Sequence, residues 1–115
     1  MVHRVTPRQI VARMAKGEHV TFVDARDAED RRTTGVRLTG AVSVGLSSVV
    51  RDATQVSRAS TVVVYGQDER DLDVPRVADA LRGVGFSDVR VLAGGFAAWI
   101  ELRYPVQAFD PALSV

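Results

Sequence analysis

The hydrophobic residues of this 115-residue chain form two alternating kinds of segment, short continuous runs and longer stretches with helical spacing. The short runs are rich in β-branched residues, which is typical of buried strands. They cover residues 20–23, 40–44, 61–65 and 88–92. The first run stops at Asp24, so we expect a carboxylate at the carboxyl end of a strand. The third run is the clearest strand signal, and because it ends at Gly66 a loop must begin there.

The first helix is predicted near the start of the chain. Thr6 is its N-cap, Pro7 occupies the first helical position, and Gln9 is placed to complete a capping box. Gly17 follows its end. Its apolar stripe consists of Ile10, Val11 and Met14.

A second helix is predicted after the polar residues 67–73. Pro75 stands near its start, and Gly83 or Gly85 ends it. Its apolar residues recur at helical intervals and predict one buried face. They are Val74, Val77, Ala78, Leu81 and Val84.

The last helix opens at the two glycines 94–95 and stops before Pro105. Phe96, Trp99 and Ile100 share one face, and we interpret Trp99 as a core residue because of the large apolar area it can bury. The glycine pair lacks the G-x-G-x-x-G spacing of a dinucleotide site. We therefore assign these glycines a steric role.

Strands that alternate with helices predict an α/β fold with a mainly parallel sheet covered by helices on both faces. No repeat, linker or low-complexity segment divides the chain, so residues 1–115 are expected to form a single domain. The net charge of +1 gives no field that would attract nucleic acid or an anionic membrane. Without a signal peptide or an apolar run long enough to span a bilayer, the sequence favours a cytoplasmic location.

The sequence contains no cysteine, so chemistry that needs a thiolate is excluded, as are disulfides and thiolate metal sites. The two histidines, His3 and His19, lack the spacing of a zinc site. We expect neither a metal nor a cofactor.

Three motifs lie in order along almost the whole chain. Residues 23–26 read Val-Asp-Ala-Arg, residues 37–41 read Arg-Leu-Thr-Gly-Ala, and residues 89–99 read Val-Arg-Val-Leu-Ala-Gly-Gly-Phe-Ala-Ala-Trp. They resemble the apolar-Asp-x-Arg, His-Ile-Pro-Gly-Ala and V-x-x-L-x-G-G-x-x-x-W motifs of the rhodanese (sulfurtransferase) homology domain. The resemblance implies a five-stranded, mostly parallel sheet with helices on both faces.

In that family, a catalytic cysteine follows the strand that corresponds to residues 61–65, within a loop whose backbone amides cradle a persulfide or an oxyanion. The matching position here is Gly66. Sulfur transfer needs a polarisable thiolate activated by N–H dipoles and a helix N-terminus. A glycine has no side chain for this role, so the resemblance implies the frame of a sulfurtransferase without its nucleophile.

The loop after Gly66 also departs from the family. It is longer than the common active form, and its charge is negative, whereas a loop that binds an anion should not be. Its four carboxylates, at Asp68, Glu69, Asp71 and Asp73, outnumber the two nearby arginines, Arg70 and Arg76. This excess of negative charge would repel an anionic substrate. The candidate binding residues of the loop are Gly66, Gln67, Asp68, Glu69, Arg70, Asp71 and Leu72. The neighbouring candidates are Asp24, Arg26 and Arg37.

The second motif departs as well. Arg37 stands where the family usually has histidine, and Arg31 or Arg32 falls near its usual aromatic residue. We therefore expect residues 27–37 to pack differently from the family. For Asp24 and Arg26 we favour a structural role, in which charge-assisted hydrogen bonds fix a loop.

These observations favour a non-catalytic binding or regulatory module that acts through residues 66–76 and the Arg37 surface, with a protein or a small molecule as partner. The alternative is an enzyme repurposed to carboxylate- or metal-dependent group transfer or hydrolysis at the same loop, since open α/β sheets bind ligands there. Asp68 or Ser57 would be its nearest nucleophile, although neither has a histidine base at a recognisable spacing. A structural subunit that forms a homodimer is the third hypothesis.

Overall fold

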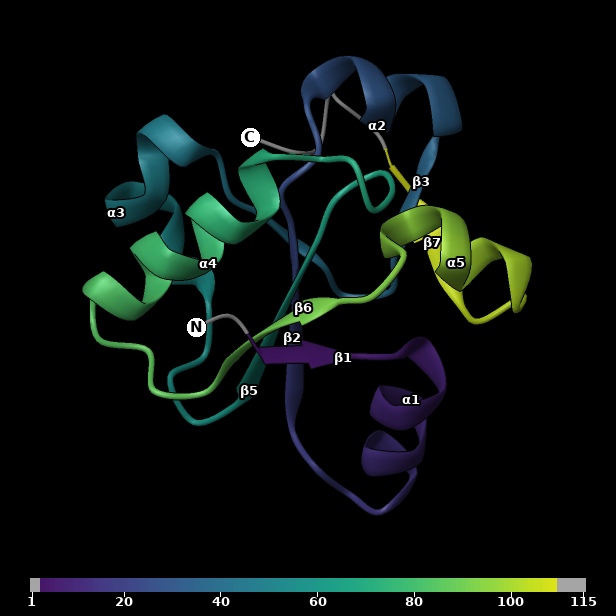
Figure 1. The fold of residues 1–115 in the computed structure, drawn as a ribbon, viewed down its shortest axis with the longest axis horizontal. Coiled ribbons are helices and arrows are strands. Elements are labelled where there is room, and N and C mark those ends of the chain that lie inside the picture. The colour runs from purple at the N-terminus through teal and green to yellow at the C-terminus, as the bar shows by residue number, and fades with distance from the viewer. Residues whose placement is uncertain (1–2, 110–115) are drawn as a thin grey trace.

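The computed structural model describes residues 3–109, in which five strands form one sheet (Figure 1). The strands of this sheet are β1 (His3–Val5), β2 (Val20–Asp24), β4 (Val42–Ser43), β5 (Thr61–Tyr65) and β6 (Val89–Leu92). Their order is β1-β6-β5-β2-β4, and every neighbouring pair is parallel. The prediction of an α/β fold with a five-stranded parallel sheet is therefore confirmed.

A second, smaller sheet lies beside the first. It pairs β3 (Val36–Leu38) antiparallel with β7 (Val106–Ala108), and Arg37 stands opposite Gln107. The sequence patterns did not predict these two strands or β1. Each has only three residues, too few to show the alternation that reveals a strand.

Five α-helices connect the strands. They are α1 (Pro7–Ala15), α2 (Ala28–Thr34), α3 (Val49–Asp52), α4 (Asp73–Gly83) and α5 (Gly95–Glu101), with 3₁₀ turns at Leu46–Ser48 and Ala53–Gln55. The predicted capping box of α1 is present, since the Gln9 amide N–H donates to the Thr6 hydroxyl and the Gln9 side chain accepts from the Thr6 N–H. No helix of residues 3–109 has the length and apolarity needed to cross a membrane.

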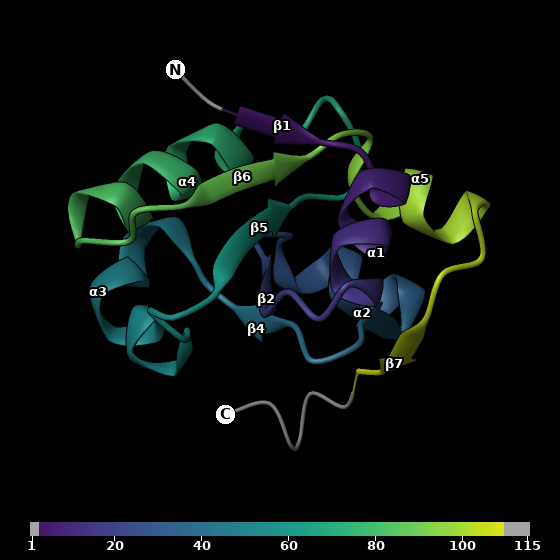
Figure 2. The ribbon, with the colours of Figure 1, turned by 90° about the horizontal axis from the view of Figure 1, so that it is seen from below.

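The helices cover both faces of the large sheet (Figure 2). α3 and α4 pack on one face, against alternate strand residues such as Val62 and Val64. α1 and α5 pack on the other face, against Val63 and Tyr65. Because every residue of β5 is buried, this central strand joins the two cores. Its carboxyl end is therefore held firmly where the loop after it begins.

Several local predictions differ from the structure. The strand expected at residues 40–44 shrinks to Val42–Ser43, because Gly40 adopts a left-handed φ of 78° that belongs to a turn. Met14 and Ile100, expected on buried helix faces, are 40% and 42% exposed. Each lies on a helix that buries other residues of its stripe, Ile10 in α1 and Phe96 with Trp99 in α5.

Residues 27–37, which the sequence indicated only as a polar segment, contain α2 and β3. The Asp27 carboxylate caps α2 by accepting a hydrogen bond from the Asp30 N–H at 2.8 Å. Gly35 ends the helix with a φ of 68°, which is the left-handed cap that favours glycine. Both caps are sequence signals that could have predicted this helix.

Candidate functional site

Gly66 lies at the carboxyl edge of the sheet, directly after β5. Its carbonyl oxygen accepts a hydrogen bond from the Phe96 N–H at 2.9 Å, and the Gln67 carbonyl accepts from the Ala97 N–H at 3.0 Å. These two bonds satisfy amides in the first turn of α5, which have no partner within their own helix. The start of the loop is therefore held against α5.

Gly66 has no room for a side chain. A Cβ atom built on it would lie 2.5 Å from the Asp71 Oδ2 atom and 2.6 Å from the Val74 Cγ2 atom. Real Cβ atoms essentially never come within 3.0 Å of another heavy atom. The space next to the backbone at this position is therefore occupied by Asp71 and Val74.

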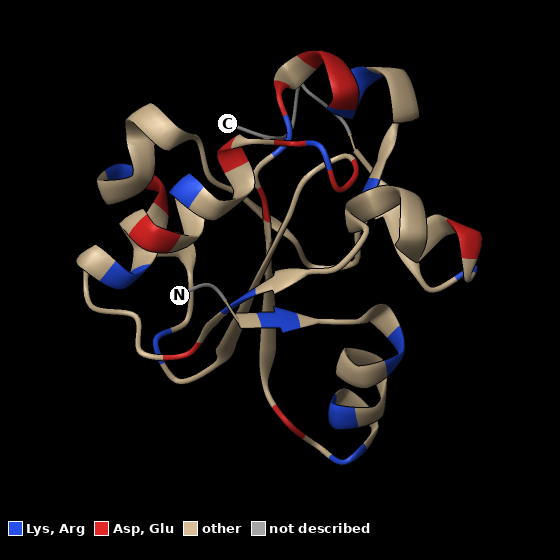
Figure 3. Cartoon of the chain, in the orientation of Figure 1, with Lys and Arg blue, Asp and Glu red and all other residues tan. Residues whose placement is uncertain are grey.

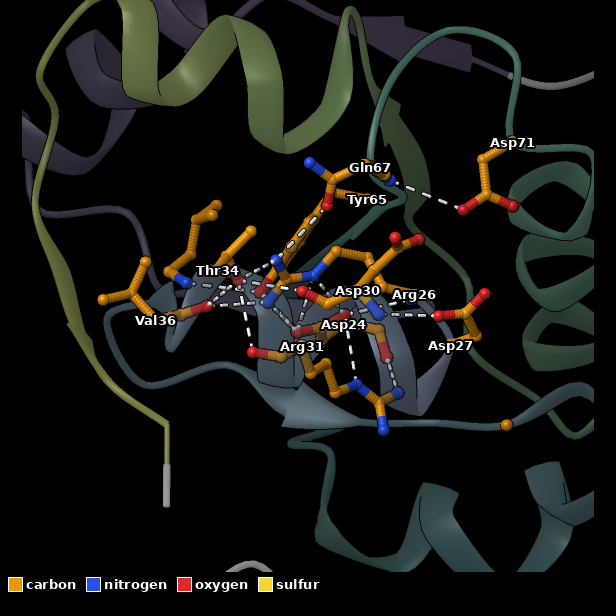
Figure 4. A network of polar contacts seen from close by, with 12 residues as sticks. Asp24, Arg26, Asp27, Asp30, Arg31, Thr34, Val36, Tyr65, Gln67 and Asp71 are labelled. Atoms are coloured by element: carbon orange, nitrogen blue, oxygen red, sulfur yellow. Dashed lines mark hydrogen bonds and ion pairs between the residues drawn. The ribbon is translucent and has the colours of Figure 1, made fainter. Parts of the chain in front are cut away.

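Three backbone amides between Gln67 and Asp73 donate to the loop's own carboxylates. Asp71 accepts from the Gln67 N–H at 3.4 Å and from the Asp73 N–H at 3.2 Å, and it thereby ties the start of the loop to the start of α4 (Figure 4). Asp68 accepts from the Arg70 N–H at 2.8 Å. Three amides that could face an external anion instead face side chains of this chain.

Charged residues of both signs follow one another along the loop (Figure 3), and Asp68, Glu69 and Arg70 form ion pairs. Glu69 lies 2.7 Å from the Arg4 guanidinium of β1, and it accepts a hydrogen bond from the Gly94 N–H before α5. Asp68 pairs with Arg70 at 3.3 Å. Hydrogen bonds from the Arg70 amide and guanidinium hold the pKa of the Asp68 carboxyl below its usual value. Leu72 stands out because its apolar side chain is 75% exposed.

Asp24 and Arg26 form an ion pair in the core beneath the loop (Figure 4). Their nearest charged atoms are 2.9 Å apart, and both side chains are fully buried. The Arg26 guanidinium also donates to the Thr34 hydroxyl at 3.0 Å and to the Val36 carbonyl at 2.8 Å. It lies 4.4 Å from the centre of the Phe96 ring. This geometry favours the structural interpretation, because the pair joins β2 to α2, β3 and α5.

Tyr65, which the sequence interpretation did not single out, completes this network. Its hydroxyl donates to the Asp24 carboxylate at 2.9 Å and accepts from the Leu38 N–H at 3.2 Å. Burial, together with the adjacent Asp24 charge, raises the pKa of the Tyr65 hydroxyl. The hydroxyl therefore stays protonated and acts as a fixed hydrogen-bond donor.

The structure brings together only some of the candidate residues. Gln67 reaches the Arg26 guanidinium at 3.5 Å, so the loop and the buried pair are neighbours. Arg37 on β3 instead lines a pocket to which none of residues 66–76 contributes. Ser57 precedes β5 and so lies toward the opposite edge of the sheet from Gly66.

The histidines lie away from the loop, and the acidic groups within residues 3–109 form no cluster typical of a metal site. His3 opens β1 and His19 precedes β2, so both lie at the amino-terminal ends of strands, away from the loop. Across residues 3–109, no three His, Asp or Glu side chains are grouped so that they could hold a metal ion.

The family model of the rhodanese-like domain matches residues 6–102. The chain belongs to the rhodanese-like domain family. The resemblance drawn from its three motifs is thus confirmed, and this rhodanese-like domain contains no cysteine.

Solved structures agree with this assignment. The Alr3790 protein from Anabaena sp. is 27% identical with a TM-score of 0.73, and the match covers 91% of this chain and 80% of that one. A solution structure of the rhodanese-like domain of the same Anabaena protein is 25% identical with a TM-score of 0.74, covering 95% and 81% of the two chains. The BH2092 protein from Bacillus halodurans, at 22% identity, supports the fold alone, with a TM-score of 0.76 over 92% of this chain and 77% of that one. No curated protein matches the chain.

Proposed function

We propose that this rhodanese-like domain is a non-catalytic module that works by binding a partner through the loop of residues 66–73. The observation that carries the proposal is the state of Gly66, where the family has its nucleophile. Not only is the thiol missing, but the Asp71 carboxylate and the Val74 methyl group occupy the space of a side chain. Without a thiol, the protein cannot form the persulfide on which sulfur transfer depends.

The surface of the loop supports contact with a protein. Internal hydrogen bonds from three of its amides hold the loop in one conformation, which lowers the entropic cost of binding a partner. It presents the exposed Leu72 side chain between charged groups of both signs, including Arg70, whose side chain is 91% exposed. An apolar side chain within a charged rim is a common arrangement at protein interfaces.

The proposal is tested by assaying the purified protein for cyanide-dependent formation of thiocyanate from thiosulfate, beside an active rhodanese. We expect no turnover above the uncatalysed rate. Turnover that a change in the loop abolishes, for example Asp71→Ala, would show that the loop is catalytic and would refute the proposal.

The second candidate is a group transfer or hydrolysis that uses carboxylates of the loop. It is favoured by the position of Asp68 and Asp71 at the carboxyl edge of a parallel sheet, where ligands commonly bind. Generic phosphate and carboxylate esters, offered with and without divalent cations, test it. If any hydrolysis found is unchanged in Asp68→Ala and Asp71→Ala, this candidate fails.

A homodimer is the third candidate. The exposed apolar side chains of Leu46, in the 3₁₀ turn before α3, and of Val50, in α3, give it a surface. Light scattering after size exclusion measures the mass directly. A strictly monomeric mass excludes this candidate.

A further inference from the structure

A pocket of about 1080 Å³ opens at the β4 edge of the sheet, away from the loop that carries the proposed function. Its walls come from α2, the β3–β7 pair, the end of β4 and the α3 region. No residue of 66–76 lines it. Its size is at the upper end of the range of small-molecule sites, about 300–1,000 Å³.

Four arginines line this pocket, namely Arg26, Arg31, Arg37 and Arg51. Arg26 is committed to its buried pair with Asp24, which leaves three arginines, each from a different element. Arg31 leans toward the buried Asp24 carboxylate at 3.5 Å and donates to the Asp24 carbonyl at 3.1 Å. Arg51 lies 3.3 Å from Asp52, but its side chain is 82% exposed, so solvent screens this pair. Neither arginine is fully neutralised by its partner.

Arg37 is the least satisfied of the three. Among residues 3–109, its guanidinium has no carboxylate partner and no hydrogen bond, and its Nε atom is buried. A buried donor without a partner carries an energetic cost, which is larger when the donor belongs to a charged group. An anion that accepts from this group would recover that cost.

The two acidic residues that line the pocket, Asp27 and Asp52, accept hydrogen bonds from groups other than Arg37 and do not neutralise it. Asp27 caps α2. Asp52 accepts from the Gly45 N–H at 3.0 Å and from the Ser48 hydroxyl at 2.6 Å. The pocket therefore keeps cationic groups that face open space.

From this arrangement we propose that the pocket binds a small organic molecule through a phosphate or carboxylate group held by Arg37, with Arg51 at the rim. A guanidinium matches the geometry of both oxyanions through two parallel N–H donors. Ser43 and Phe109 also line the pocket. They provide a further hydrogen-bond donor and an apolar surface for the rest of the molecule. This binding does not depend on the loop, so it stands or falls separately from the proposed function.

The test is a titration followed by two-dimensional ¹⁵N–¹H NMR, including the arginine Nε–H signals. Inorganic phosphate is added in one arm and succinate in the other, with sodium chloride of equal ionic strength as the reference. We expect saturable shifts at Arg37, Ser43 and Phe109 in at least one arm, and the arm that responds identifies the oxyanion. The absence of saturable shifts at these residues in both arms overturns the proposal.

Variants make the test specific. Arg37→Gln is expected to weaken binding about tenfold or more, since it removes a charge-assisted pair. Arg51→Gln, at an exposed side chain whose loss leaves the core intact, is expected to weaken it about two- to fivefold, as for a screened charge. Arg70→Gln makes the same charge change in the 66–73 loop and should leave binding unchanged. Equal affinity in wild type and both pocket variants, or equal weakening by Arg70→Gln, contradicts the proposal.

Discussion

Gly66 is required for a different reason from most other glycines of the chain. Gly17, Gly35 and Gly40 have positive φ angles and open space around them, so the backbone conformation favours glycine there. Gly66 has no positive φ, and any L-residue could adopt its backbone conformation. A side chain at Gly66 is excluded by the close approach of Asp71 and of Val74 in α4.

Gly66→Ala is accordingly expected to destabilise the protein by about 1–3 kcal/mol, the usual cost of adding a methyl group to a packed site. Urea unfolding measures the change. Gly83→Ala is the matched control, because Gly83 lies at the exposed end of α4 with nothing within 4 Å of the added atom. This control should be neutral or stabilising by up to about 1 kcal/mol. Equal stability of wild type and Gly66→Ala would show that the site is not filled.

The buried Asp24–Arg26 pair leads to a second prediction at this scale. Asp24→Asn leaves the Arg26 charge in the core without its counterion and should destabilise the protein by about 3–5 kcal/mol. Asp79→Asn, which removes the partner of Arg82 from an exposed pair in α4, should cost at most about 0.5 kcal/mol. Thermal or urea unfolding compares the two variants, and a similar loss in both would argue against a structural role for Asp24.

Among the elements, the segment between β4 and β5 depends on one side chain. Asp52 at the end of α3 reaches back to the Gly45 amide and the Ser48 hydroxyl, and so closes the turn that begins the helical segment. Desolvation raises the pKa of this carboxyl. The hydrogen bonds from Ser48 and Gly45 outweigh that effect and hold its pKa below the usual value.

Because the folded-state pKa of Asp52 is lower than its unfolded value of about 3.9, its contribution to stability is complete above that value. The contribution is lost as the pH falls through the folded-state pKa. Asp52→Asn should therefore cost about 1–3 kcal/mol at pH 6, and the difference from wild type should shrink as the pH falls below the unfolded value of about 3.9. Ser48→Ala, which removes only one of the bonds, should show a smaller difference with the same trend. A difference that is constant with pH would refute this account.

The elements also show where sequence patterns suffice. β5 and α4 were predicted because a β-branched run and a regular helical stripe are strong local signals. The β3–β7 pair was missed because two three-residue strands, 67 residues or more apart in sequence, become partners only after the chain has folded. In the site, the motifs pointed to Gly66, but the groups that fill its space, Asp71 of the loop and Val74 of α4, could not be identified from spacing.

For the whole molecule, the parallel sheet determines where function can lie. All five strands end at one edge, which places the 66–73 loop and α2 at the same side of the fold (Figure 1). The loop has several of its amides and charges paired internally, whereas the pocket at the β4 edge is lined by Arg37, which has no partner among residues 3–109. The rhodanese-like fold is retained here, while the space beside Gly66, the position that the motif resemblance matches to the family's nucleophile, is filled.

The most direct test of that central claim is the thiosulfate–cyanide sulfurtransferase activity of Gly66→Cys, with folding verified by circular dichroism and an active rhodanese assayed in parallel. The account predicts no thiocyanate beyond the wild-type level. The introduced thiol would be crowded by Val74 and would face the Asp71 carboxylate, which raises the pKa of a thiol and repels thiosulfate. Clear turnover by the folded variant would contradict the account, because it would show that only the thiol is missing and that the loop still works as a catalytic cradle.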